Sequence, residues 1–280
     1  MSISLLGASE VRSLGQELDL RPAKSLGQNF VVDANTCQKI VRIAEVKSGE
    51  RVLEIGPGLG SLTLAILQVT SEVSVIEIDT RLASRLPETI SAHGAPAVEV
   101  INSDALSVNV LQFPPKKLVA NLPYNVSVPV LLHYLELCPS IESGVVMVQY
   151  EVAERLAAKP GSKSYGVPSA KSAWWCDVEL SDSVSRSVFW PVPNVDSALV
   201  SFKRRAPIGN EELRLTTFQL IDSAFGKRRK MLRSAISALI GSSNEAETLL
   251  IEAGIDPTAR GESLDISQFA RLARAWQASK

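Results

Sequence analysis

Four consecutive residues, Asn121-Leu122-Pro123-Tyr124, carry groups that can recognise a flat molecule with an exocyclic amine. They follow a short apolar run that is typical of a buried strand. Because Pro123 fixes its own φ and disfavours a helical Leu122, the chain is expected to turn out of the sheet here. The Asn121 amide oxygen and the Leu122 carbonyl can then accept the two hydrogens of the amine, and the Tyr124 ring can stack on the flat face. The alternative is a strand-end turn in which Asn121 bonds only to nearby backbone.

A glycine-rich loop lies upstream, between a predicted strand at 51–55 and a helical pattern that begins at Ser61. Its sequence is Gly56-Pro57-Gly58-Leu59-Gly60, and glycine allows a backbone to pass close beneath a ligand. Glu77 ends the next predicted strand about 20 residues after the first glycine, where a carboxylate commonly binds ribose hydroxyls. Glu54, just before the loop, adds a second carboxylate on the same side.

Nicotinamide dehydrogenases use the same strand, loop and helix layout, with the fingerprint GxGxxG. Here Ser61 occupies the position of the third glycine, and the spacing is GxGxG. The Glu54 carboxylate would repel a pyrophosphate but attract an ammonium group. The loop therefore favours an adenosyl cofactor with an amino-acid tail over a dinucleotide.

Two further positions carry polar groups that could meet the same ligand. Asp104 follows a predicted strand at 98–101, and its carboxylate can accept a hydrogen bond from an adenine amine. The alternative for Asp104 is a turn or an N-cap. Gln28 and Asn29 lie in a polar loop before a helix that Asp33 is predicted to cap, and taken alone this loop indicates only a helix start.

Strands that alternate with helices to about residue 205 predict an α/β, doubly wound domain. Further strands are expected at 73–76, 118–120, 144–148, 174–180 and 198–202, and helices at 34–44, 61–67, 128–137 and 149–156, with one short helix within 1–20. Residues 159–171 are predicted as a flexible basic loop, and 189–197 as a proline-stiffened loop that can hold an aromatic ring. From Asn210 onward the pattern predicts helices only, at 211–225, 228–240, 244–253 and 265–278.

A basic run, Lys227-Arg228-Arg229-Lys230, lies inside this helical part. Together with Lys203, Arg204, Arg205 and the 159–171 loop, it could line a cleft that binds phosphates. The alternative is a solvated charged face. Global charge does not decide between them, because 29 Lys and Arg balance 30 Asp and Glu.

Composition limits the other classes of function. The three cysteines form no CxxC pair and there are only two histidines, so no metal site and no disulfide framework are predicted. No apolar run reaches membrane-spanning length, and the N-terminus lacks the pattern of a signal peptide. We therefore expect a soluble, cytoplasmic protein without membrane contact, with a monomer as the default state.

Taken together, the motifs resemble those of the ribosomal RNA adenine dimethyltransferases, which dimethylate adjacent adenines near the 3′ end of small-subunit ribosomal RNA. The resemblance runs from Lys24 to the C-terminus and rests on KSLGQNF, EIGPGLG, IEID, SDAL, NLPYN, QYEVAERL, FWPVPNVDS and FGKRRK, in that order. Eight ordered motifs are too many for chance agreement.

The resemblance implies a class I (Rossmann-like) methyltransferase domain at 1–205, with an N-terminal extension and motif at 1–45, and a helical domain at 206–280 that recognises RNA or the ribosome. The implied methyl donor is S-adenosylmethionine, with S-adenosylhomocysteine as product, and the implied partner is 16S rRNA in the small subunit or its precursor, with a role in subunit biogenesis. With the loop residues above, the predicted cofactor contacts are Asn29, Val31, Glu54, Gly56, Gly58, Glu77, Asp104 and Asn121. Val31 departs from the family, which commonly has leucine there.

The implied chemistry is attack of adenine N6 on the donor methyl group, with the protein mainly positioning the amine. Asn121 and Leu122 would accept hydrogen bonds from N6, while Tyr124 and Phe189 would sandwich the extruded base. The residues predicted to contact RNA are Lys24, Lys203, Arg204, Lys227, Arg228, Arg229 and Lys230.

Two related functions remain open beside the dehydrogenase. A large-subunit rRNA adenine methyltransferase of the antibiotic-resistance type shares the cofactor loop, although those sequences tend to have isoleucine in place of Leu122. A non-catalytic assembly or RNA-binding factor could be built on the same fold, but an intact set of Glu77, Asp104 and Asn121 favours an enzyme.

Overall fold

The computed structural model describes residues 3–20 and 29–280. Within these ranges the chain divides into two compact units, one formed by 1–153 and 179–204 and the other by 154–178 and 205–280. Each unit has its own cluster of buried apolar side chains.

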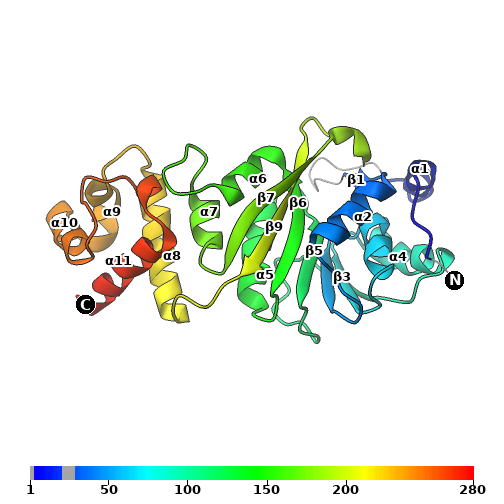
Figure 1. Ribbon diagram of the computed structural model, residues 1–280, viewed down its shortest axis with the longest axis horizontal. Helices are drawn as coiled ribbons and strands as arrows, with labels where there is room; N and C mark the ends of the chain where they lie inside the picture. Colours follow the sequence, from blue (N-terminus) through cyan, green and yellow to red (C-terminus); the bar gives the residue numbers. More distant parts are fainter. Residues whose placement is uncertain (1–2, 21–28) are drawn as a thin grey trace. The chain divides into compact units, whose positions relative to one another are not determined.

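A seven-stranded sheet organises the first unit (Figure 1), with the strand order β4-β3-β2-β5-β6-β9-β7. The strands are β2 Val52–Ile55, β3 Val73–Glu77, β4 Glu99–Asn102, β5 Lys117–Asn121, β6 Ser143–Gln149, β7 Cys176–Val184 and β9 Ser197–Arg204. β2 to β6 pair in parallel, and β9 runs antiparallel to β6. The central strands are mostly apolar and are buried along nearly their whole length, because a parallel sheet is covered on both faces.

The helices of this unit differ in how they begin, because only some of those described have a side-chain cap. They are α1 Ala8–Glu17, α2 Ala34–Ile43, α3 Ser61–Leu67, α4 Thr80–Ala92 and α5 Ser127–Leu137, and α6 Tyr150–Ala157 follows β6. Asp33 caps α2 by accepting from Thr36 N at 2.9 Å, as predicted. α4 was not predicted, because Pro87 lies inside it and an interior proline usually breaks a helix.

Register places the carboxyl ends of four parallel strands along one edge of the sheet. Ile55 of β2 lies opposite Ile76 of β3, Glu77 of β3 lies opposite Asn102 of β4, and Asn121 ends β5. In open α/β sheets, ligands bind outside this edge. The loops that carry the candidate chemistry therefore meet there.

A two-stranded ribbon joins the N-terminal region to the loop before β9. β1 Phe30–Val31 pairs antiparallel with β8 Phe189–Trp190. α1 packs against this ribbon, since a Cβ placed on Gly15 would lie 2.4 Å from two atoms of the Trp190 ring. The proline-stiffened loop predicted at 189–197 is thus extended and paired at its start.

The second unit is helical, with α7 Val167–Ser172, α8 Glu211–Gly226, α9 Leu232–Ile240, α10 Ser243–Glu252 and α11 Ile266–Ala278. The helix predicted from residue 228 begins only at Leu232, because residues 227–230 form a turn. α7 replaces part of the loop predicted at 159–171. It forms because Gly166 N donates to Ser169 Oγ at 2.8 Å and Ala170 is buried.

Residues 154–178 also depart from the predicted division at residue 205, which assigned them to the methyltransferase domain. Tyr165, Ala170 and Trp174 are buried in the cluster of the helical unit, and the Tyr165 hydroxyl donates to Leu264 O at 2.9 Å. Their apolar side chains are buried against residues that follow about 40 or more positions later in the chain. Local sequence patterns do not indicate such long-range contacts, so the sequence did not predict this boundary. The assignment of RNA recognition to the helical part stays a prediction.

Candidate active site

A single cavity at the carboxyl edge of the sheet is lined by most of the predicted site residues. They are Asn29, Val31, Glu54, Gly56, Gly58, Glu77, Asp104, Asn121, Leu122 and Tyr124. These positions are spread over almost a hundred residues of sequence, and the parallel register brings them together. Their roles toward a ligand remain predictions.

The glycine loop passes directly beside the Asn121 turn. A Cβ placed on Gly56 would lie 3.8 Å from Asn121 O and 3.8 Å from Pro123 Cδ. Gly58 has a φ of +57°, and a Cβ there would lie 2.9 Å from the Phe30 ring. Both the backbone conformation and the close neighbour thus require glycine at position 58.

Glu77 is held by the backbone on both sides of its carboxylate. Oε2 accepts from Gly58 N at 3.0 Å, and Oε1 accepts from Asp79 N at 3.0 Å. Burial raises the pKa of Glu77, while these N–H donors act in the opposite direction. The carboxylate is therefore fixed to the glycine loop, at the position predicted to meet a ribose.

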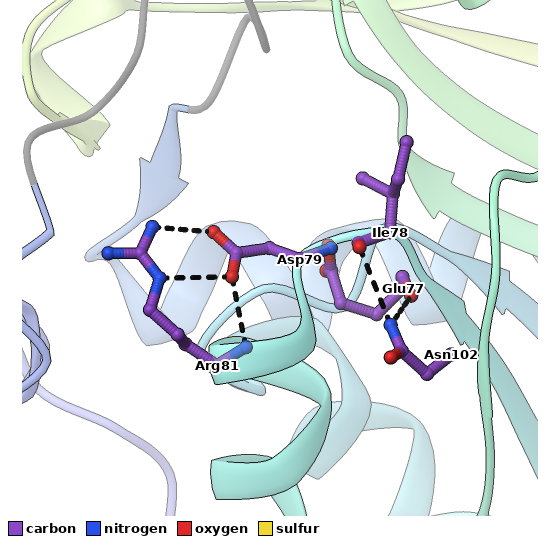
Figure 2. Close-up of polar contacts among 5 residues, drawn as sticks. All are labelled: Glu77, Ile78, Asp79, Arg81 and Asn102. Carbon is purple, nitrogen blue, oxygen red and sulfur yellow. Dashed lines mark hydrogen bonds and ion pairs between the residues drawn. The ribbon is translucent and has the colours of Figure 1, made fainter.

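The end of β4 is tied to the end of β3 through Asn102, as Figure 2 shows. Asn102 Nδ2 donates to Glu77 O at 2.8 Å and to Ile78 O at 3.4 Å. In the same view Asp79 bonds to Arg81 and caps α4, so the second acid of the IEID motif stabilises the helix start. This arrangement orients Glu77 and Ile78 together.

Glu54 is a carboxyl group in an almost fully desolvated position, 1% exposed. Thr63 Oγ1 donates to its Oε2 at 2.6 Å. Burial raises the pKa of Glu54 to about 8, Thr63 lowers it, and the nearby Glu77 raises it. A cation that entered the cavity would favour its ionised form.

Asp104 is exposed, lines the cavity and forms a turn, as the second of its two predicted roles requires, while its bond to an adenine amine stays a prediction. Its Oδ1 accepts from Leu106 N at 2.9 Å. Leu106 and Ile78, which the sequence analysis did not select, also line the cavity and are 38% and 51% exposed. Their signal in the sequence is an apolar residue one or two positions after a strand-end acid.

The Asn121 amide is oriented by the segment that precedes β1. Its Nδ2 donates to Asn29 O at 3.0 Å, which leaves Oδ1 as the group that can accept from a ligand. Ser61 Oγ donates to Val31 O at 2.7 Å and holds the same segment from the glycine loop. Ser61, which stands in place of the third glycine of the dinucleotide fingerprint, thus stabilises the N-terminal segment beside the cavity.

Phe189, the other aromatic residue predicted to sandwich the base, is buried in the structure. It is 2% exposed, belongs to the apolar core and pairs with Val31 across the ribbon, and it is absent from the described residues that line the cavity. Its ring is buried because β8 pairs with β1. Tyr124 is therefore the aromatic residue of the predicted pair that lines the cavity, and the stacking of a base on Phe189 stays a prediction.

Arg204 also differs from its prediction as an RNA contact. Its guanidinium donates to the carbonyls of Leu135 at 2.8 Å and Cys138 at 3.0 Å, at the end of α5. Cationic side chains stabilise helix C-termini, which explains this position. Lys203 and the run Lys227–Lys230 are exposed, although Arg228 bonds to Glu262 and to Lys163 O. Lys24 lies outside the described residues.

Comparison with known proteins identifies the family. A family model described as ribosomal RNA adenine dimethylase matches residues 20–278. The chain belongs to this family. It is an S-adenosylmethionine-dependent methyltransferase, and the α/β sheet with a helical C-terminal part is the fold expected of the ribosomal RNA adenine dimethylases.

Similar proteins cover almost the whole chain. A ribosomal RNA small subunit methyltransferase A from Thermobifida fusca is 53% identical over 274 residues, covering 96% of this chain and 95% of that protein. Another from Leifsonia xyli subsp. xyli is 53% identical over 275 residues, covering 97% and 98%.

Two solved structures extend the comparison to the fold. A dimethyladenosine transferase from Plasmodium falciparum has a TM-score of 0.73 at 26% identity and covers 87% of this chain and 95% of its own. The 23S rRNA methyltransferase ErmE has a TM-score of 0.67 at 28% identity and covers 89% of this chain and 100% of its own.

The cavity fits the cofactor of the ribosomal RNA adenine dimethylases. Two glycines leave room for a ligand close to the backbone, Glu77 offers carboxylate oxygens, and the desolvated Glu54 suits a positively charged amino group. Among residues 3–20 and 29–280, no cluster of His, Cys, Asp and Glu could hold a metal ion. No helix in these ranges is long and apolar enough to span a bilayer.

Proposed function

We propose that this protein transfers methyl groups from S-adenosylmethionine to N6 of two adjacent adenines near the 3′ end of 16S rRNA, in the small ribosomal subunit or its precursor. The product is N6,N6-dimethyladenosine. Relatives that are about half identical over nearly the full chain are named as small-subunit methyltransferases, which supports this substrate. The observation that carries the proposal is the Asn121 amide, oriented by Asn29 O at the cavity that also contains the cofactor residues.

The first task of the cavity is to hold the cofactor, which supplies an electrophilic methyl group when it is bound. We assign Glu77 to the ribose hydroxyls, Asp104 to the adenine amine and Glu54 to the amino group of the methionine part. Ile78 and Leu106 present apolar surface for the adenine ring.

The second task is to orient the target adenine. The N6 lone pair is delocalised into the ring, so the amine is a weak nucleophile in its planar form. Hydrogen bonds from N6 to Asn121 Oδ1 and Leu122 O draw the nitrogen toward tetrahedral geometry and localise the lone pair. Tyr124 supports the face of the base after it leaves its stack, which is worth roughly 1–3 kcal/mol.

Exposed basic residues, the cellular location and the oligomeric state complete the proposed function. Exposed basic side chains at Lys203, Lys227, Arg229 and Lys230 can contact RNA phosphates. We propose a cytoplasmic monomer, in keeping with a ribosomal substrate and with the composition. A role in subunit biogenesis would accompany the modification.

A second candidate is methylation of large-subunit rRNA, because the fold is also similar to that of the 23S rRNA methyltransferase ErmE. The two substrates require the same chemistry at N6. They differ in the RNA that must reach the cavity, which the shape of the cavity alone does not specify.

Transfer of labelled methyl groups distinguishes these functions. Unmethylated small subunits, large subunits and protein-free RNA are incubated with the enzyme and labelled cofactor, and the RNA is digested to nucleosides. Label in N6,N6-dimethyladenosine from small subunits is the expected result. Label only from large subunits would assign the second candidate, and cofactor binding without any transfer would indicate a non-catalytic assembly factor.

A further inference from the structure

The Tyr124 side chain forms a hydrogen bond with a buried residue, Ser197, that does not line the cavity. The phenolic hydroxyl of Tyr124 lies 2.7 Å from Ser197 Oγ. Tyr124 lines the cavity, whereas Ser197 is 0% exposed and is absent from the described residues that line it. The hydrogen bond therefore joins a ligand-facing ring to the protein interior.

Ser197 is a rigid attachment point. It is the first residue of β9 and lies opposite Gln149 of β6 in the antiparallel register. The preceding residue, Asp196, accepts from Tyr150 N at 3.0 Å through its backbone carbonyl. The Ser197 hydroxyl forms its side-chain hydrogen bond with Tyr124. Because Ser197 is held in the sheet, its hydrogen bond to Tyr124 can hold the tyrosine ring in a fixed position relative to β9.

We propose that Ser197 is a positioning residue for methyl transfer, which fixes the position of the Tyr124 ring so that the target base stacks in one place beside Asn121. This inference rests on the proposed function. The hydroxyl oxygen of a tyrosine lies on the axis of its ring torsion, so a hydrogen bond there restrains χ1: a change of χ1 would carry the Tyr124 hydroxyl away from Ser197 and move the whole ring. The Asn121 amide is held in a similar way by Asn29 O at 3.0 Å, so both groups that meet the base are oriented in advance.

The chemistry of the pair agrees with a purely orienting role. Burial raises the pKa of the Tyr124 phenol above its ordinary value; the hydrogen bond with Ser197 lowers it, and the negative charge of Asp196 raises it. The hydroxyl therefore stays protonated at neutral pH, and the Tyr124–Ser197 bond does not depend on the reaction. Ser197 acts through Tyr124 and does not touch the base.

The test is a double-mutant cycle of Ser197→Ala and Tyr124→Phe, which remove the same hydrogen bond from opposite sides. Ser201→Ala is the matched control, because Ser201 is on the same strand and forms a hydroxyl–hydroxyl bond of 2.8 Å to Ser181, a pair that does not line the cavity. Single-turnover methyl transfer to unmethylated small subunits, cofactor affinity by calorimetry and the ratio of monomethyl- to dimethyladenosine are measured for each variant.

Each single variant is expected to lower the transfer rate roughly 3- to 10-fold, the effect of one lost hydrogen bond. The double variant should lose no more than either single variant, and cofactor affinity should stay within about twofold of wild type. Monomethyladenosine should accumulate, because the second transfer has only one amine hydrogen left for orientation and depends more on stacking. The Ser201→Ala control should match wild type.

Several results would overturn this role while leaving the proposed function intact. They are a Ser197→Ala enzyme with the wild-type rate and product ratio, losses that multiply in the double variant, or a loss explained by weaker cofactor binding. If Ser197→Ala does not fold, Tyr124→Phe carries the test by itself, and a wild-type rate in that variant overturns the role. A wild-type protein that methylates no adenine would overturn the proposed function and this role with it.

Discussion

Glu54 and Glu77 line the same cavity, but their carboxyl groups are stabilised in different ways. Burial raises the pKa of Glu77, but two backbone N–H groups donate to its carboxylate and act in the opposite direction. Glu54 is 1% exposed and has a neutral hydroxyl donor, so burial dominates and raises its pKa to about 8. Near neutral pH, Glu54 therefore holds a proton in the absence of a cation.

This difference predicts a pH-dependent stability. The pKa of Glu54 is raised from 4.5 in the unfolded chain to about 8 in the folded chain, so the folded state binds the proton more tightly. Its contribution is fully present below the lower value and is lost as the pH rises through the upper value. We expect the free energy of unfolding of wild type to fall relative to Glu54→Gln by a few kcal/mol across this range.

Denaturant unfolding of wild type and Glu54→Gln at several pH values between about 5 and about 8 measures this difference. Groups that are common to both variants cancel in the comparison. Parallel stability curves for the two proteins would show that Glu54 titrates normally in the folded state.

Asn121 allows the sharpest test of the proposed chemistry at a single residue. Asn121→Ala removes the acceptor for N6, so methyl transfer should fall below detection while cofactor affinity stays within a few-fold of wild type. Labelled transfer and calorimetry measure the two quantities, and circular dichroism checks the fold. A folded variant with unchanged turnover would rule out this role of the amide.

At the scale of elements, the glycine loop and β1 form one packed layer beside the cofactor site. Phe30 of β1 is 7% exposed, stacks on Trp190 with a centroid distance of 6.1 Å and lies against Gly58. Ser61 Oγ, at the start of α3, holds Val31 O. A substitution in the glycine loop is thus expected to displace the segment from Asn29 to Val31, whose Asn29 carbonyl accepts from the Asn121 amide.

Alanine at position 58 should disturb this layer. The new Cβ would lie 2.9 Å from the Phe30 ring, and overpacking of this kind costs about 1–3 kcal/mol. We expect Gly58→Ala to weaken cofactor binding roughly tenfold or more. Gly49→Ala is the control, because Gly49 also has a positive φ, +77°, but no atom within 4 Å of its Cβ position.

Gly49→Ala should therefore cost stability by about 1–2 kcal/mol through backbone strain alone and leave cofactor affinity unchanged. Calorimetric titration with S-adenosylmethionine and thermal unfolding separate the two effects. Equal affinity losses in both variants would mean that strain, and not contact with Phe30, determines cofactor binding.

At the scale of the whole molecule, the residues that line the cavity belong to the first unit, whereas the basic run belongs to the second. Lys227, Arg229 and Lys230 are exposed in the turn between α8 and α9. Contacts from such side chains to phosphates release counterions, which makes RNA binding depend on salt concentration.

The variant Arg229→Ala/Lys230→Ala should weaken RNA binding and reduce the slope of log affinity against log salt by up to about two. Cofactor affinity should not change. Arg42→Ala/Lys47→Ala, which removes the same charge from exposed positions of the first unit, should bind RNA as wild type does. Binding titrations at several salt concentrations measure both, and equal losses would indicate that overall charge alone drives binding.

Features that depend on neighbouring residues were predictable from the sequence. Apolar runs, the Asp33 cap, the glycine loop and strand-end acids are local, and parallel pairing necessarily brings strand ends to one edge. The predicted cofactor residues consequently line one cavity.

Other features depend on which distant side chains pack together. Phe189 is buried because β8 pairs with β1, Arg204 bonds to the end of α5 because β9 runs beside β6, and Trp174 joins the helical unit. The contact of Tyr124 with Ser197 likewise joins the turn after β5 to the first residue of β9. Segments that are remote in sequence bury and bond to one another only when the chain has folded. The exposure of the Phe189 ring and of the Arg204 guanidinium therefore depends on tertiary packing and not on the sequence motifs in which they stand.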